Sequence, residues 1–234
     1  MVQETGRDNG RVKSIQLDKY FFCEYYYPNK GVLDSPKRLI FLEVTYMKKN
    51  LGAKPYIYPQ PVLIVASYDE DGIPNAMNVA NGGIVKSNRL QINIGVSHKS
   101  AENIKIKGAF TIGIADEKNL VAADYVGIVS GEDVPDKLDK TGWKIGKSEF
   151  VNAPVIEDLP ITMECKVEEI NQYGQTLRIV AIIENVLVDD ELVTENDGID
   201  LSKFSPICYD PANCGYLKLG EKVGDAFKDG NKIK

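Results

Sequence analysis

Residues 90–108 read LQINIGVSHKSAENIKIKG, and the pattern of the chain changes halfway along them. Apolar residues take every second position from Leu90 to Val96, which predicts a β-strand with one buried face. A short helix is predicted to start at Ser100 after a turn, where Ser100 and Asn103 resemble an N-cap arrangement. Gly108 directly follows the last helical residues, as expected for a C-terminal stop. The segment therefore predicts a strand that leads into the N-terminus of a helix.

The turn before this helix has the groups that could hold a phosphate. Free backbone N–H groups and the positive end of the helix dipole meet there, beside Ser97, Lys99 and Ser100. The alternative is an ordinary capped helix with a solvated lysine. Spacing alone favours this alternative, because capped helices far outnumber phosphate sites. The choice therefore depends on the rest of the chain.

Short strand patterns dominate the chain from residue 61 onward. The predicted strands cover residues 61–68, 73–80, 89–96, 109–115, 162–171 and 176–189. Asp69-Glu70-Asp71-Gly72 predicts a hairpin turn, and Asn81-Gly82-Gly83 marks a strand break with a close backbone approach or a bulge. A second short helix is predicted over 119–125, and 127–146 read as a long surface excursion. This order favours a closed antiparallel β-barrel over a parallel α/β sheet.

Composition and charge argue against several classes of function. A formal net charge of −6 over 234 residues disfavours nucleic acid as a partner. No apolar run reaches membrane-spanning length, and the N-terminus lacks the order of a secretory signal, so we expect no membrane partner. With His98 as the only histidine, a zinc site and a Ser-His-Asp triad are both disfavoured. Free cysteines in a reduced, cytoplasmic context are expected, with a Cys208–Cys214 disulfide as the alternative.

Residues 1–46 do not follow the pattern of the rest, because no helical or strand period persists across them. Met47 looks like a fresh start, and codons for Glu43-Val44 would contain the core of a bacterial ribosome-binding sequence at a suitable distance before it. Our hypothesis is that residues 1–46 are an N-terminal extension that is not native or is poorly ordered. The functional domain would then cover residues 47–234. The alternative is a genuine extension that packs on the barrel or on a partner.

Several segments in the same order resemble the flavin reductase-like family, and within it the flavoredoxin branch. They read PQPVLIVASYDEDGIPNAMNVANGGI, SHKSAENIKIKGAFTI, AADYVGIVSG, APVIEDLPITMEC and GYLKLGEKVGDAF, and the resemblance runs from about Met47 to the C-terminus. It implies a mainly β fold, an antiparallel FMN-binding split β-barrel of the Greek-key type with a few short helices. It also implies a homodimer with FMN near the subunit interface.

The resemblance implies, position by position, which residues hold the cofactor. Residues 75–83 would line the isoalloxazine, the turn before the helix would hold the phosphate, and Lys137 would reach the phosphate from the surface excursion. The full set is Asn75, Asn78, Ala80, Asn81, Gly82, Ser97, His98, Lys99, Ser100, Asn103, Lys137 and Tyr209. Each has a plainer alternative, such as asparagines in turns and edge strands, a surface histidine, or a solvated lysine at a helix start.

The implied function is an FMN-dependent oxidoreductase of the flavin reductase or flavoredoxin type. A flavin accepts hydride on its own ring, so no protein side chain is expected to act as a catalytic nucleophile or base. Electrons would come from NAD(P)H or from a protein donor and pass to a small-molecule or protein acceptor. The alternative is a non-enzymatic flavin-binding or electron-carrier module.

Overall fold

The computed structural model describes residues 48–234 and, before them, the backbone of four short strands. These are β1 (Glu4–Thr5), β2 (Val12–Leu17), β3 (Tyr20–Tyr25) and β4 (Ile40–Glu43), which pair antiparallel in that order. The chain forms two compact units, residues 1–54 and residues 55–234. The sequence pattern of residues 1–46 did not reveal these strands: β3 is aromatic at most positions, so it shows no polar–apolar alternation. The hypothesis of a start at Met47 concerns a position outside the described residues.

Twelve strands and two α-helices are described in the second unit. The strands are β5 (Gln60–Pro61), β6 (Leu63–Tyr68), β7 (Pro74–Val79), β8 (Gly82–Lys86), β9 (Arg89–Gly95), β10 (Ala109–Ile114), β11 (Ile145–Lys147), β12 (Pro154–Ile156), β13 (Ile161–Tyr173), β14 (Thr176–Val188), β15 (Ile207–Asp210) and β16 (Gly215–Lys218). The α-helices are α1 (Lys99–Lys107) and α2 (Leu120–Ile128), and short 3₁₀ turns cover Asp139–Thr141, Asp190–Leu192 and Asp229–Ile233.

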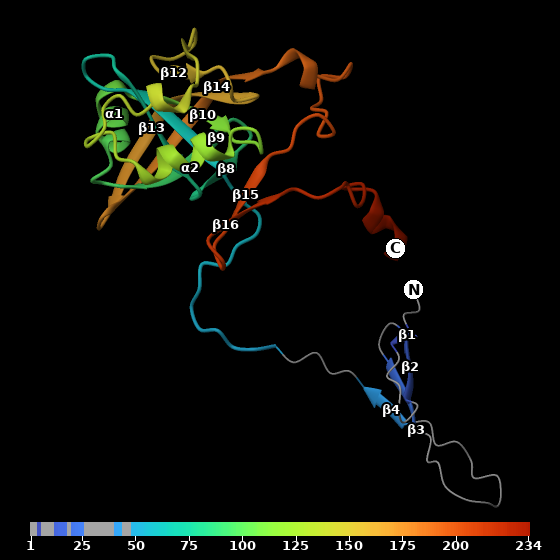
Figure 1. Ribbon diagram of the computed structural model, residues 1–234. Helices are drawn as coiled ribbons and strands as arrows, with labels where there is room; N and C mark the ends of the chain where they lie inside the picture. The colour runs from blue at the N-terminus through green and yellow to red at the C-terminus, as the bar shows by residue number, and fades with distance from the viewer. Residues whose placement is uncertain (1–3, 6–11, 18–19, 26–39, 44–47) are drawn as a thin grey trace, which may run out of the picture. The chain divides into compact units, whose positions relative to one another are not determined.

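Seven of these strands form one antiparallel sheet in the order β7-β6-β10-β13-β14-β9-β8 (Figure 1). β7, at one edge of the sheet, also contacts β9, which lies next to the other edge, so the sheet curls back on itself. The predicted mainly β, antiparallel barrel is confirmed. A separate small sheet, β16-β15-β5, comes from the C-terminal hairpin and the segment before β6.

The core lies on both sides of β6. Leu63 and Val65 belong to the apolar cluster that contains Phe110 and Ile112, whereas Ile64 and Ala66 belong to a second cluster with α2. Because successive side chains of a strand point to opposite faces, β6 is buried on both faces and reads as a continuous apolar run. The second cluster fixes α2 against the sheet, which places the C-terminal end of α2 beside the edge strand β7.

The local predictions hold with small differences. Gly72 has φ +84° in the predicted β6–β7 turn, and α2 ends at Ile128, three residues beyond the prediction. The strand break expected at residues 81–83 lies at residues 80–81, between the end of β7 and the exposed strand β8, which starts at Gly82. A Cβ at Gly82 would lie 2.7 Å from the Leu63 side chain, so the close backbone approach expected for this glycine is confirmed.

No helix among the described residues is long and apolar enough to cross a membrane.

Candidate functional site

The site begins where β9 leads into α1. Leu90, Ile92 and Ile94 are buried as predicted, and Gly108 ends the helix in the left-handed conformation with φ +64°. The helix starts one residue early, so its N-cap is His98, and Ser100 already lies in the first turn. The prediction of an N-cap at Ser100 was therefore wrong. Ser100 is buried instead, and its Oγ accepts a hydrogen bond from Asn75 Nδ2 at 2.9 Å.

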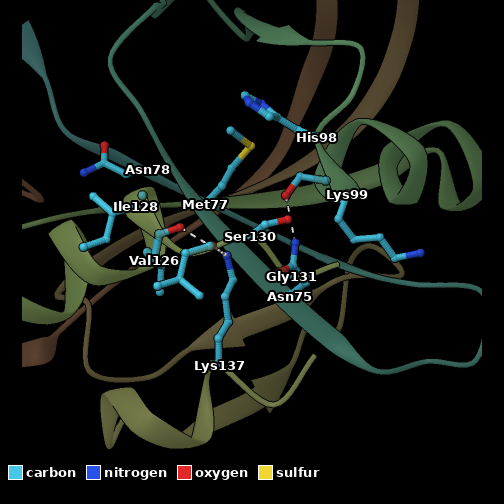
Figure 2. A pocket seen from close by; sticks show the side chains of 13 residues that line it. Asn75, Met77, Asn78, His98, Lys99, Val126, Ile128, Ser130, Gly131 and Lys137 are labelled. Carbon is cyan, nitrogen blue, oxygen red and sulfur yellow. Dashed lines mark hydrogen bonds between the residues drawn. The ribbon is translucent and has the colours of Figure 1, made fainter. Parts of the chain in front are cut away.

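A cavity of about 270 Å³, which we call the main cavity, lies between β7, the start of α1 and the C-terminal end of α2 (Figure 2). Six predicted residues line it: Asn75, Asn78, His98, Lys99, Ser100 and Lys137. The rest of the lining is Met77, which lies within the predicted stretch 75–83 but was not singled out, and the continuous segment 126–131, which was not assigned to the site. The alternation of β7 places Asn75 and Met77 on one face and Asn78 on the other, so the cavity follows the free edge of this strand.

Two asparagines fasten this edge strand to the two helices. Asn75 reaches Ser100 on α1, and Asn78 Nδ2 donates to the backbone carbonyl of Ala123 on α2 at 3.1 Å. The turn after α2 packs closely on Asn75, because a Cβ at Gly131 would collide with Asn75 Oδ1. Asn75 Oδ1 is buried and has no hydrogen-bond partner within the described part of the chain. A buried acceptor of this kind costs free energy until a donor reaches it.

Lys137 brings a buried positive charge to the same cavity. Only 2% of the residue is exposed, and its Nζ donates to the carbonyls of Val126 at 3.1 Å and Val129 at 2.7 Å (Figure 2). Both carbonyls belong to the negative end of the α2 dipole. Burial lowers the pKa of Lys137 to about 8. An ammonium has three donors, so one N–H is left over, and among residues 48–234 no carboxylate pairs with Lys137.

Lys99 is placed quite differently. Its Nζ lies 2.8 Å from Glu102 Oε2, one turn further along α1, and Figure 2 shows the end of the side chain directed away from the other lining residues. The hydrogen bond to Glu102 is the main cause that raises the pKa of Lys99. A partly exposed pair of this kind stabilises a protein by only about 0–1 kcal/mol, so the ammonium can exchange Glu102 for another anion at small cost.

A second cavity of about 220 Å³, the tyrosine cavity, adjoins the first. It is lined by Asn78, Ala80, Asp124, Gly127, Ile128, Tyr209 and Tyr216. Asn78, Gly127 and Ile128 line both cavities, so the two are neighbours along α2 and β7. Tyr216 donates its hydroxyl to Asp124 Oδ1 at 2.7 Å, and burial, followed by this bond, raises the pKa of Tyr216.

The other predicted residues lie outside both cavities. Ser97 is exposed, and Asn81 is exposed with its backbone carbonyl accepting the N–H of Asn93 at 2.8 Å. Asn103 is fully buried, and neither of its side-chain polar atoms has a partner in the described ranges. Among the residues that sequence reasoning missed, Tyr216 had a usable signal: it faces Tyr209 across a short hairpin, β15–β16. Asp124 had none, because a single acidic residue in an apolar helix is unremarkable in sequence.

The antiparallel barrel and the cavity at its strand edge define a split-barrel protein. A family model described as flavin reductase like domain matches residues 56–213, and the chain therefore belongs to this family. The structure resembles that of the flavoredoxin of Desulfovibrio vulgaris (Miyazaki F), which is 32% identical, with a TM-score of 0.75 over 79% of this chain and 100% of that chain.

Two further solved structures are also similar to this chain. The flavoredoxin from Methanosarcina acetivorans is 25% identical, with a TM-score of 0.73 over 81% of this chain and 100% of that chain. An FMN-binding domain of a flavin reductase-like enzyme from Shewanella baltica is 19% identical, with a TM-score of 0.63 over 71% of this chain and 89% of that chain, and it supports the fold alone. The expected family and its split-barrel fold are thereby confirmed.

Proposed function

We propose that the protein binds FMN in the main cavity and acts as an oxidoreductase, passing electrons from NAD(P)H or a protein donor through the flavin to an acceptor. Membership of the flavin reductase like domain family supports flavin-linked redox chemistry. One observation carries the proposal to this cavity. The buried ammonium of Lys137 lines the same cavity as the unpartnered acceptor of Asn75.

These two residues suit the two kinds of polar group in FMN. A buried cation without a carboxylate partner is stabilised by an anionic ligand, so Lys137 would hold the phosphate. Asn75 Oδ1 needs a hydrogen-bond donor, which a ribityl hydroxyl would supply. The N-terminal N–H groups of α1 lie at the same cavity and favour an anion there. The residues present therefore fit the cofactor that the family implies.

Lys99 remains a second candidate for the phosphate, as the family resemblance implies. Its ammonium is engaged by Glu102, whereas Lys137 is held in the cavity wall by two carbonyl acceptors. A positioned cation loses less conformational entropy on binding than one that must first leave a partner. We therefore prefer Lys137 to Lys99 as the residue that contacts the phosphate.

The bound flavin would supply the electron-transfer chemistry on its own ring, so the protein need not provide a nucleophile or base. The described side chains instead bind, orient and shield. Asn75 and Asn78 hold the cavity edge between the two helices, and Met77, Val126 and Ile128 provide its apolar surface. This apolar part of the wall would shield the reacting ring from water and strengthen the polar contacts beside it.

Purification and titration test the proposal. We expect the purified protein to be yellow, or to become so with FMN, and to bind FMN more tightly than riboflavin, because riboflavin has no phosphate for Lys137. NADH or NADPH should then bleach the flavin absorbance without an added partner if the protein is a reductase. A flavin that stays oxidised until a reduced carrier protein is added would support the electron-carrier alternative. Failure to bind any flavin would refute the proposal.

We also propose a homodimer, which the family resemblance implies. Ile128 lines both cavities, yet 75% of it is exposed, so an apolar surface stands open at the rim of the site. A two-fold symmetric partner is a common way to cover such a surface. Light scattering of the FMN-loaded protein should give twice the monomer mass of 25.9 kDa. A monomer that retains FMN tightly would count against the dimer.

A further inference from the structure

The tyrosine cavity has chemistry opposite to that of the main cavity. Two tyrosine rings and one carboxylate line it, and among residues 48–234 no lysine or arginine forms an ion pair with that carboxylate, Asp124. The main cavity next to it contains the ammonium of Lys137. A ligand that enters the tyrosine cavity therefore meets a negative group and not a positive one.

The carboxylate is held in place from the opposite side of the cavity. The Tyr216 hydroxyl, which comes from β16, donates to Asp124 Oδ1 on α2 at 2.7 Å. This bond leaves the other carboxylate oxygen without a side-chain donor in the described residues. Because the bond spans two elements, the negative charge has a fixed position beside the cavity rather than moving with a free surface side chain.

The two rings add a second attraction for positive charge. Tyr209 and Tyr216 meet edge to face, with ring centroids 6.3 Å apart and an interplanar angle of 61°. Each ring carries negative potential on its face and attracts a cation placed there. A flat ligand can pack against an aromatic ring, and the cavity of about 220 Å³ has room for a single ring rather than for a dinucleotide.

We propose that the tyrosine cavity binds a planar organic cation of the pyridinium class, with Asp124 as its counter-charge and the tyrosines as its walls. This inference rests on the proposed function for its purpose: it would place the cationic ring of an electron acceptor, or of the oxidised donor, next to the flavin cavity. Asn78, Gly127 and Ile128 line both cavities, so a ring in one lies directly beside a ligand in the other.

Three small probes of the same shape test the charge preference. These are 1-methylnicotinamide, a cation; nicotinamide, which is neutral; and nicotinate, an anion. Binding of each to the full chain, first without FMN and then loaded with it, is measured at low salt by chemical-shift changes of the tyrosine rings. We expect the cation to bind about tenfold more tightly than the neutral probe, from cation–π and charge attraction together, and nicotinate to bind most weakly.

Asp124→Asn removes the negative charge and keeps the shape of the side chain, because the asparagine oxygen can still accept the hydrogen bond from the Tyr216 hydroxyl. We expect this variant to bind the cation and the neutral probe equally. Asp71→Asn, in the exposed turn between β6 and β7, is the matched control and should keep the preference. Tyr209→Leu should weaken binding of the cationic probe but leave part of its advantage over the neutral probe, because Asp124 is still present. Thermal melting of each variant distinguishes loss of binding from loss of folding.

Three results would overturn the inference: equal affinity for all three probes, a preference that survives Asp124→Asn, or binding that disappears once FMN is loaded. The first two measurements use flavin-free protein, so they stand even if the protein proves not to bind FMN. Conversely, FMN binding with no charge preference at the tyrosine cavity would leave the proposed function intact and remove only this inference.

Discussion

The two cavities share three wall residues and differ in charge. Asn78, Gly127 and Ile128 belong to both, yet the main cavity contains a buried ammonium and the tyrosine cavity a carboxylate. Lys137 is fixed by carbonyls at the end of α2, whereas Asp124 lies within α2 and is fixed by Tyr216. The ammonium of Lys137 and the carboxylate of Asp124 are therefore both held at the same short helix, and the two cavities beside it have opposite charge. A ligand with an anionic group would favour the main cavity, and a second ligand with a cationic ring would favour the tyrosine cavity.

Lys137→Gln is the strongest way to break this difference. Glutamine can still donate to the carbonyls of Val126 and Val129, but it carries no charge. A charge-assisted contact is worth roughly 1.5–3 kcal/mol, so FMN affinity should fall on the order of ten- to a hundred-fold. Riboflavin affinity should hardly change. The measurement is the FMN-to-riboflavin affinity ratio by fluorescence titration.

Lys99→Gln is the matched control for that experiment. Its ammonium already has a carboxylate partner in Glu102, so we expect the ratio to stay close to that of the wild type. If Lys99→Gln lowers the ratio and Lys137→Gln does not, the phosphate lies at the turn before α1, as the family resemblance implies. Cation binding at the tyrosine cavity should survive both substitutions.

Gly131→Ala should disturb the packing of the main cavity and leave the tyrosine cavity unchanged. The added Cβ would collide with Asn75 Oδ1, and the Asn75 side chain cannot move far without breaking its hydrogen bond to Ser100. Forcing an extra methyl group into a packed site costs roughly 1–3 kcal/mol. We expect lower thermal stability and weaker FMN binding, measured by melting with and without FMN. Gly174→Ala tests strain at a turn with φ +57° that lines neither cavity, and it should affect stability without changing flavin binding relative to folding.

The pH dependence tests the charge on Lys137 directly. Its pKa in the folded protein, about 8, lies below the ordinary value of 10.5, so the unfolded chain binds the proton more tightly than the folded one. Stability of the flavin-free protein should therefore rise as pH increases from about 8 to about 10.5. FMN affinity should fall over the same range, by up to about tenfold per pH unit, because only the ammonium attracts the phosphate.

Proton uptake gives a check on this assignment. A bound phosphate stabilises the ammonium, so FMN binding near pH 8 should take up a proton, seen as a dependence of the calorimetric heat on the buffer. Lys137→Gln should abolish both the uptake and the rise in stability. Persistence of either in that variant would assign the effect to another group.

Ser100→Ala should have the smallest effect of the set. It removes one neutral hydrogen bond, from Asn75 Nδ2, at a residue that lines the main cavity, and the net cost is about 0.5–1.5 kcal/mol in unfolding free energy. The loss has a different origin from the helix cap that the sequence suggests, since Ser100 lies inside the helix. A double variant with Asn75→Ala should lose less than the sum of the two single variants, measured by chemical denaturation. Additive losses would show that the two side chains act separately.

Most of the predicted residues that the structure brings together in the main cavity lie near the β7 edge and the β9–α1 turn. Asn75, Asn78, His98, Lys99 and Ser100 all line the main cavity. Their neighbours Asn81 and Ser97 do not, because alternation along a strand and the twist of a turn direct adjacent side chains to different places. Positional likeness to a family thus located the segments, and the side-chain directions then separated lining residues from their neighbours.

The sequence by itself determined what depends on a few neighbouring residues. The period of two in β9, the glycine with positive φ at the β6–β7 turn and the glycine that ends α1 each follow from local sterics and burial. Only the tertiary structure decided which distant groups meet. Ser100 meets Asn75 across 25 positions and Tyr216 meets Asp124 across 92, and the buried Lys137 meets the carbonyls at the end of α2. A period describes one element, whereas a cavity and its charge arise from the packing of several elements, so no local pattern contains them.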